Sequence, residues 1–452
     1  MKINSESLSL TRHWRQVRSH PLVWDTFTTT SLSIIGNAIG FLVPFFIAAW
    51  FGVTSETDAF FFAYGIILFI ASIFSPVVES VIVPYIAEIK AKGQNVAHFV
   101  SQVFGISTVF IIVVTAIVLL SIRLFLPHIT RFDVSSLRLI YILVLETTPL
   151  VITLMWSSIF AGVLNAYKKF SIPAFSPAFR SMVSILVIFL LKDTLNIHAV
   201  ALGYVAGELL RILLLFAALR KSRFPFYISF GWSERLRHFL QMGAYQIIGM
   251  LALGAHPLIG KTMASWLSKG SVSILHYAER LYMIPSVMIT TGLIVTILSH
   301  WSESYYIKGK EDFRRKVARM VKIVLAMTIV LTLFLIVGRH PLVAFAFGRG
   351  AFPAESLIPC ADTFAFYMIG FPLWVAAIIY TRAHMVMKNT VILMKLGILG
   401  AVLNFFLNLL LMKYFGVQGI ALSTSIVNGV IAFFLWTGFK KAARQQKGIG
   451  PA

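Results

Sequence analysis

The chain has 452 residues, of which 58% are hydrophobic and only 12% are charged. Soluble domains contain about 25% charged residues, so this composition excludes a soluble globular protein and indicates a polytopic membrane protein. The net charge of +22 would suggest nucleic-acid binding in a soluble protein. In a membrane protein it indicates basic residues on the anionic cytoplasmic surface, so the expected partners are anionic lipids and no nucleic acid. The single cysteine, Cys360, excludes an internal disulfide framework and a cysteine-based metal cluster.

Twelve apolar runs are long enough to form transmembrane helices, each of which needs about 20 mostly apolar residues. The first six lie at 26–50, 59–87, 99–122, 137–167, 173–191 and 199–219. The second six lie at 246–267, 271–300, 321–338, 357–386, 394–414 and 419–439. This pattern predicts an all-α membrane protein with about twelve transmembrane helices in two six-helix lobes.

The predicted organisation has five parts. They are a cytoplasmic basic N-terminal segment (1–25), an N-lobe (26–222), a cytoplasmic linker (223–245), a C-lobe (246–440) and a cytoplasmic tail (441–452). The first segment has no short apolar core and no small-residue cleavage site, so no cleaved signal peptide is expected. Lys and Arg are several times more frequent in the connections on the side of the N-terminus, which predicts that both termini lie inside.

The two halves carry a weak internal repeat, because Trp50 and Glu88 are echoed by Trp266 and Glu303. An even number of helices intervenes, so the repeat would be parallel, with a substrate site between the lobes near the membrane midplane. The alternative is a chance likeness between two hydrophobic hairpins.

Arg280 is the most informative charge, because it lies about nine residues, or roughly 13 Å, inside the run 271–300. A guanidinium stays charged, so it needs a water-filled cavity, a counter-ion or an anionic ligand. A local pair with Glu279 is the structural alternative, but neighbouring side chains on a helix diverge by about 100°. Ser273, Tyr277 and Arg280 instead share one polar stripe, which favours a functional cavity.

Further charges lie at membrane depth. Lys261 follows Pro257 in the seventh predicted helix, where a water-lined bend and a purely structural position are both open. Glu79 is a candidate proton carrier or counter-ion for the basic groups. Glu208 and Arg211 are three residues apart on one helix face, which predicts a structural ion pair.

Five more polar residues have local explanations. Asp58 ends a Ser55-Glu-Thr-Asp58 sequence that fits a capping box. Arg180 is expected to extend toward the cytoplasmic interface, and Glu146, just before a proline, supports a broken helix or lines a cavity. The pair Asn404 and Asn408 is expected to join helices, with coordination of a monovalent cation as the alternative.

Several stretches resemble one family. They are Phe51-Gly52 with Thr57-Asp58-Ala59-Phe60-Phe61, Val83-Pro84-Tyr85-Ile86-Ala87-Glu88, Phe170-Ser171-Ile172-Pro173-Ala174-Phe175-Ser176-Pro177, and Gly270-Ser271-Val272-Ser273 with Tyr277-Ala278-Glu279-Arg280-Leu281. In chain order they resemble the lipid II flippase branch (MurJ/MviN) of the multidrug/oligosaccharidyl-lipid/polysaccharide exporter superfamily.

The resemblance implies two six-helix lobes around a cationic cavity in the bacterial plasma membrane. It also implies alternating access that moves a polyprenyl-pyrophosphate-linked saccharide from the inner to the outer leaflet. The residues matching Arg280 and Asp58 are functionally important in that family. Taken together with the charges at membrane depth, the resemblance gives these expected cavity residues: Arg280, Lys261, Asp58, Glu79, Tyr277 and Ser273.

Two departures from the family pattern keep an alternative open. No Lys or Arg occurs between Arg18 and Lys90, where peptidoglycan-branch members carry cavity arginines, and the sequence stops after the twelfth predicted helix, without two further helices. The expected function is therefore a flippase for lipid II or a related envelope precursor. The alternative substrate is a lipid-linked exopolysaccharide or O-antigen-type unit.

Rival classes are less favoured. The basic bias argues against a drug or cation antiporter, and the short connections offer no catalytic or metal-binding loop for a membrane-embedded glycosyltransferase. We therefore expect no enzymatic activity, no metal site and no cofactor. Coupling to the membrane potential, H⁺ or Na⁺ is open, and envelope-synthesis enzymes are candidate partners.

Overall fold

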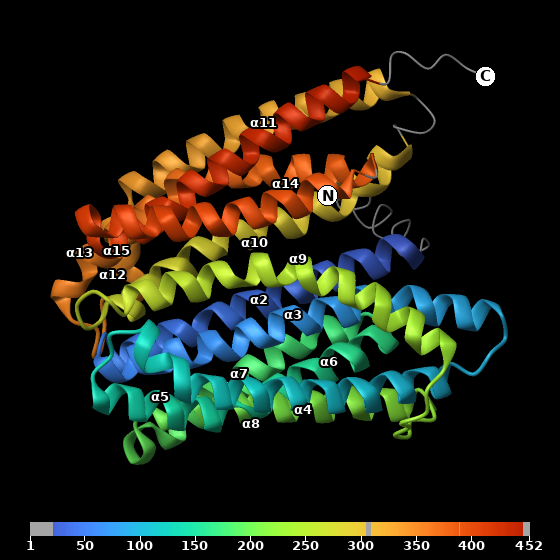
Figure 1. Cartoon of the computed structure of the whole chain (residues 1–452), viewed down its shortest axis with the longest axis horizontal. Coiled ribbons are helices and arrows are strands. Elements are labelled where there is room, and N and C mark those ends of the chain that lie inside the picture. Colours follow the sequence, from blue (N-terminus) through green and yellow to red (C-terminus); the bar gives the residue numbers. More distant parts are fainter. Residues whose placement is uncertain (1–20, 304–308, 388, 446–452) are drawn as a thin grey trace, which may run out of the picture.

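The computed structural model describes residues 21–303, 309–387 and 389–445. Every regular element in this part of the chain is a helix. Eight of its segments are long and apolar enough to cross a membrane, and the long helices run roughly along one direction (Figure 1). The predicted all-α polytopic fold is confirmed, whereas the exact number of crossings stays a prediction.

The N-terminal group of helices forms one half of the molecule. α7 packs against both α2 and α8, and α3 packs against α5 and α6. The group comprises α2 (Pro21–Phe51), α3 (Ser55–Ala91), α4 (Val96–Ile129), α5 (Val134–Thr147), α6 (Pro149–Ala166), α7 (Ser171–Leu195) and α8 (His198–Lys221).

Polar side chains at helix starts explain several boundaries. At α3, the Thr54 hydroxyl accepts a hydrogen bond from the Thr57 amide, and the Thr57 hydroxyl accepts one from the Thr54 amide. Asn95 caps α4 and Asp133 caps α5. The predicted capping role of Asp58 is therefore wrong: Thr54 and Thr57 form the box, which leaves the Asp58 carboxylate available to another partner.

The helix predicted at 137–167 is broken between α5 and α6. Pro149 lacks the N–H that would continue the helix by bonding to the Leu145 carbonyl, and the Thr148 amide bonds to that carbonyl instead at 3.3 Å. Glu146 pairs with His198 at the start of α8, with 2.8 Å between Oε1 and Nδ1. Its role is therefore to join α5 to α8 beside the break.

The C-terminal group forms the other half. α9, α13 and α14 pack against α15, and α10 packs against α13. The group comprises α9 (Glu234–Ala264), α10 (Ser271–Glu303), α11 (Lys310–Val337), α12 (Arg339–Phe347), α13 (Ala354–Ile369), α14 (Phe371–Val386) and α15 (Thr390–Gln445). Because α9 begins at Glu234, part of the predicted linker is helical.

The last element, α15, is two helices that meet at Gly416. This residue has φ 57° and ψ −133°, a conformation that only glycine adopts readily. The chain reverses there, so the two parts of α15 lie side by side (Figure 1). The predicted division between the runs 394–414 and 419–439 agrees with this position.

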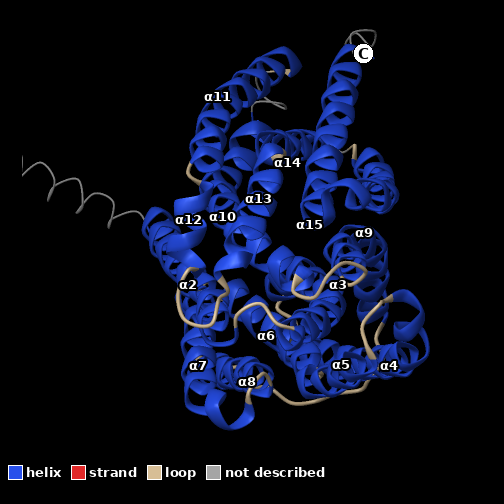
Figure 2. Cartoon of the chain, turned by 90° about the vertical axis from the view of Figure 1, so that its left-hand side faces the viewer, coloured by secondary structure: helices blue, strands red, loops and turns tan. Residues whose placement is uncertain are grey.

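The two groups meet at one end of the long helices and diverge toward the other (Figure 1). Where they meet, α10 contacts both α2 and α3, α12 contacts α2, and α9 packs along α3. Viewed along the helices, the two groups lie one above the other, with α9 beside α3 (Figure 2). We call the end at which α2 turns into α3 the joint end.

Candidate functional site

The carboxylate of Asp58 on α3 closes the N-terminal end of α10. Its Oδ2 accepts a hydrogen bond from the Gly270 amide (2.6 Å), and its Oδ1 accepts from the Ser273 amide (2.7 Å) and the Ser273 hydroxyl (2.6 Å). The first amides of a helix lack partners within it and carry the positive end of its dipole, so a carboxylate is stabilising there. Asp58 is 3% exposed and Ser273 is 0% exposed. A residue of the N-terminal group therefore caps a helix of the C-terminal group.

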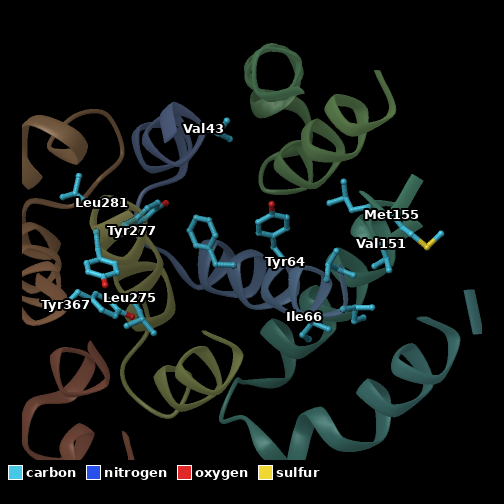
Figure 3. Close-up of a cluster of buried hydrophobic side chains, with 14 of the residues drawn as sticks. Val43, Tyr64, Ile66, Val151, Met155, Leu275, Tyr277, Leu281 and Tyr367 are labelled. Atoms are coloured by element: carbon cyan, nitrogen blue, oxygen red, sulfur yellow. The ribbon is translucent and has the colours of Figure 1, made fainter. Parts of the chain in front are cut away.

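Tyr277, one turn further along α10, makes a second contact between the groups. Its hydroxyl donates to the Gly52 carbonyl (3.0 Å) directly after α2, and its buried ring packs against Phe61 and Phe347. Figure 3 shows Tyr277 pointing from α10 toward the N-terminal group. Gly52 has φ +66°, and a Cβ there would lie 2.2 Å from the Ala351 carbonyl oxygen. This close approach requires glycine.

The loop between α12 and α13 makes a third contact. The Ala351 amide donates to the Ala49 carbonyl at 2.7 Å, one of the last carbonyls of α2 that have no partner within the helix. Gly350 has φ +67°, and a Cβ there would lie 2.1 Å from the same carbonyl oxygen. Backbone of the C-terminal group therefore lies directly on the end of α2.

Lys261 on α9 is 3% exposed and donates to the Phe61 carbonyl of α3 at 3.1 Å. A Cβ at Gly65 would lie 3.0 Å from Lys261 Cδ, so the absent side chain leaves room for the lysine. The His276 ring stacks on Phe61 beside it, with 3.9 Å between ring centroids. In this structure Lys261 holds α9 to α3, and a role in a water-lined cavity stays a prediction.

We call these contacts together the joint. Asp58, Ser273, Tyr277 and Lys261 were all predicted to line a cavity, and here each is buried in a contact between the two groups. Their part in substrate binding stays a prediction. Glu79 belongs to α3, but its side chain lies outside the described part of the structure.

Arg280 lies on α10, one turn beyond Tyr277 on the inner side of the joint. Its guanidinium is only partly buried, and among the described residues its one hydrogen-bond contact is to Met283 Sδ at 3.6 Å. It forms no ion pair with any described residue, and Glu279 lines a different space, so the alternative of a local Glu279–Arg280 pair is not realised. A permanent charge in this situation calls for water or an anion.

The predicted ion pair between Glu208 and Arg211 is confirmed, with 3.1 Å between Oε1 and Nη1. A second arginine joins it, because Arg180 Nη1 lies 3.3 Å from Glu208 Oε2. The expectation that Arg180 extends to the interface is therefore wrong. The Ser157 hydroxyl donates to Glu208, and Arg211 Nε donates to the Ser176 hydroxyl at 3.0 Å. Two guanidiniums share one carboxylate inside the N-terminal group.

The partner of Arg180 was missed because it depends on how α7 packs against α8. At Gly203 a Cβ would lie 2.5 Å from Ile188 Cγ1, and at Gly207 it would lie 2.6 Å from the Arg180 carbonyl oxygen. Two glycines four residues apart allow helices to approach closely in membranes. The spacing of Gly203 and Gly207, directly before Glu208, was the sequence feature that could have predicted this close packing of α7 and α8.

A cavity of about 320 Å³ lies within the C-terminal group, between α9, α10, α13, α14 and α15. Asn404 Nδ2 donates to the Ser423 hydroxyl at 3.4 Å, and Asn408 Nδ2 donates to Asn404 Oδ1 at 3.2 Å. The asparagines thus connect the two parts of α15, as predicted. Three polar atoms of the lining have no hydrogen-bond partner among the described residues: His256 Nε2, the Tyr282 hydroxyl and Asn408 Oδ1. Sequence reasoning found the asparagines but not the cavity.

Solved structures share this arrangement of helices and identify the fold. An inward-facing multidrug resistance MATE family transporter of the MOP superfamily superposes with a TM-score of 0.76 at 12% identity, covering 94% of this chain and 100% of the other. A lipid II flippase MurJ in an inward closed conformation gives 0.78 at 22% identity, covering 93% and 89%. The fold is that of a polytopic transporter of this superfamily.

The family follows from the sequence comparison. The family model described as lipid II flippase MurJ matches residues 47–451, and the chain belongs to this family of multi-pass bacterial inner-membrane transporters. A protein named "Probable lipid II flippase MurJ" from Buchnera aphidicola is 26% identical over 416 residues, which cover 88% of this chain and 80% of the relative. One of the same name from Rickettsia prowazekii is 25% identical, covering 87% and 79%.

Proposed function

We propose that this protein translocates lipid II, a polyprenyl-pyrophosphate-linked saccharide, from the inner to the outer leaflet by alternating access. The family supports the substrate class. The observation that carries the proposal is Arg280, a partly exposed guanidinium between the two helix groups with no carboxylate partner among the described residues. A pyrophosphate would supply the charge that it lacks, through short charge-assisted hydrogen bonds.

The joint gives this proposal a mechanism. With both termini inside, the joint end faces outward, so the groups are closed toward the outside and separated toward the cytoplasm. The pyrophosphate would enter from the cytoplasmic leaflet and bind Arg280 just inside the joint. Because Ser273 and Tyr277 lie on the same helix as Arg280, a movement of α10 toward the anion would act on the contacts that close the joint.

A second candidate substrate is a lipid-linked exopolysaccharide or O-antigen-type unit. The observation in its favour is that no Lys or Arg occurs between Arg18 and Lys90, so the first two predicted helices contribute no cation to the site. Both substrates carry a lipid pyrophosphate, and Arg280 would serve either one.

Translocation in proteoliposomes tests the proposal. Lipid II is placed in one leaflet, and its appearance in the other is followed with a reagent that reads only the exposed saccharide. Arg280→Ala should lower the rate at least about tenfold, because charge-assisted hydrogen bonds contribute about 1.5–3 kcal/mol each. Arg280→Lys keeps the charge but not the planar fork and should be intermediate.

The matched control is Arg138→Ala, which removes one exposed arginine of α5 and should transport like the wild type. Equal rates for Arg280→Ala and the wild type would contradict the proposed function. Transport of an O-antigen-type lipid but not of lipid II would select the second substrate.

A further inference from the structure

The Glu208 cluster distributes its partners unequally between its two arginines. Arg211 donates from Nη1 to Glu208 at 3.1 Å and from Nε to the Ser176 hydroxyl at 3.0 Å. Arg180 has a single hydrogen bond to a described residue, from Nη1 to Glu208 Oε2 at 3.3 Å. An arginine has five N–H donors, so most of those on Arg180 remain available to a further acceptor.

Charge and exposure point in the same direction. Two guanidiniums and one carboxylate leave the cluster with one positive charge in excess. The side chain of Glu208 is 0% exposed, that of Arg211 is 15% exposed and that of Arg180 is 29% exposed. The excess charge is therefore most accessible at Arg180.

Two tyrosines connect the surroundings of Arg180 and Arg280, which belong to different helix groups. Tyr204 lies one turn before Glu208, the partner of Arg180, on α8. Tyr64 lies one turn beyond Phe61 on α3 and Arg280 one turn beyond Tyr277 on α10, and the Phe61 and Tyr277 rings are 5.1 Å apart between centroids. The two tyrosine rings lie 4.7 Å apart between centroids, and neither hydroxyl bonds to a described residue. Figure 3 shows Tyr64 pointing from α3 toward other helices of the N-terminal group. The two tyrosines therefore link the surroundings of Arg180 to those of Arg280.

The backbone that carries Arg180 is held firmly. The Ser184 hydroxyl donates to the Arg180 carbonyl at 3.0 Å, and Gly207 brings α8 against the same carbonyl. A guanidinium on a fixed helix, oriented on one side by a buried carboxylate, is prepared for an anion before the anion arrives.

We propose that Arg180 is an anion-binding residue and that, with Arg280 across the two groups, it forms a site for the phosphate groups of the substrate, bordered by Tyr64 and Tyr204. This inference rests on the proposed function and adds the N-terminal half of the binding site. Each planar guanidinium can donate two parallel hydrogen bonds to phosphate oxygens. A pyrophosphate carries enough oxygens to engage both arginines at once.

Binding to the purified full-length chain in detergent tests the site, with farnesyl pyrophosphate as the probe and farnesol as the uncharged control. We expect Arg180→Gln and Arg280→Gln each to weaken binding of farnesyl pyrophosphate at least about tenfold, as loss of a hydrogen bond to a charged group predicts. Arg138→Gln and the binding of farnesol should be unchanged. Glu208→Gln should keep or tighten binding of farnesyl pyrophosphate, because the amide oxygen can still accept from Arg180 while the negative charge that competes with the anion is removed.

A merely structural Arg180 predicts another pattern. Arg180→Gln and Glu208→Gln would then both lower the unfolding temperature and leave binding as in Arg138→Gln, and this result overturns the inference. If Arg180→Gln does not fold, Arg180→Lys provides the same comparison, because it keeps the charge and loses the paired N–H donors of the guanidinium. Binding of farnesyl pyrophosphate by Arg180→Lys at the wild-type level also overturns the inference.

Further measurements distinguish free phosphate from lipid-borne phosphate as the ligand, and distinguish failure of this inference from failure of the proposed function. Competition by inorganic pyrophosphate that disappears in Arg180→Gln supports a site for phosphate from either source. If Arg180→Gln weakens binding of farnesyl pyrophosphate but leaves competition by inorganic pyrophosphate unchanged, the site is assigned to lipid-borne phosphate. Weaker binding in Arg280→Gln with unchanged binding in both Arg180 variants contradicts this inference alone. Equal binding by Arg280→Gln and the wild type contradicts the proposed function.

Discussion

At the scale of single residues, two charges associated with α10 have opposite surroundings. The Asp58 carboxylate accepts three hydrogen bonds from the start of α10, whereas Arg280 has no acidic partner among the described residues. A buried charge with all its hydrogen bonds made is part of the architecture. A charge without a partner is available to a ligand. Asp58 therefore belongs to the closure of the joint, and Arg280 is the residue that we propose binds an anion.

Asp58→Asn should loosen the joint without abolishing the fold. The amide keeps one acceptor oxygen but loses the negative charge at the helix start, and hydrogen bonds to charged groups contribute about 1.5–3 kcal/mol. Spin labels on cysteines introduced at Glu56 and Ser268, two exposed positions on opposite sides of the joint, report its state. The native Cys360 is buried and should not interfere. We expect a broader distance distribution with a longer mean, and a distribution identical to that of the unsubstituted chain would contradict this role.

At the scale of elements, helix ends add to the packing of α9 along α3 in closing the two groups at the joint. Near the end of α2 the Ala49 carbonyl accepts from the Ala351 amide, and at the start of α10 the first amides donate to Asp58. Backbone atoms that have no partner within their own helix are thus hydrogen-bonded to the other helix group. Glycines at positive φ permit this approach. These backbone contacts can separate and re-form without repacking a core, which suits the proposed opening of the joint during transport.

Gly350→Ala should separate the α12–α13 loop from α2. The new Cβ would lie 2.1 Å from the Ala49 carbonyl oxygen, in addition to the cost of a positive φ. Gly93→Ala is a matched control, because Gly93 has φ +65° and no atom within 4 Å of the added Cβ. We expect Gly93→Ala to lower the free energy of unfolding by about 1 kcal/mol and Gly350→Ala to lower it further and to lengthen the Glu56–Ser268 label distance. Equal effects of the two substitutions on stability and on the label distance would show that the loop does not close the joint.

At the scale of the whole molecule, the two helix groups are closed at one end and diverge at the other (Figure 1). The direction in which they open relative to the membrane depends on the orientation, which rests on the distribution of Lys and Arg. The proposed path of the lipid head, from the cytoplasmic side to the joint, requires the joint end to face outward.

Cysteine labelling in intact cells checks this orientation. Ser268→Cys lies at the joint end and Gln94→Cys lies between α3 and α4 at the other, and both positions are exposed. A membrane-impermeant maleimide should label Ser268→Cys in intact cells and Gln94→Cys only after the cells are opened, with the unsubstituted chain unlabelled because Cys360 is buried. The reverse pattern would invert the proposed direction of access.

The sequence by itself determined the membrane class, the positions of most helices and the Glu208–Arg211 pair, because these depend on composition, on apolar runs and on residues one helical turn apart. It also pointed to Arg280, since a charge within an apolar run is visible without coordinates. Only the tertiary structure decided that Asp58 bonds to Ser273, 215 residues further along the chain, and that Arg180 shares Glu208. Those partners depend on which helices pack together, and helix packing is set by contacts between distant segments that no local pattern specifies.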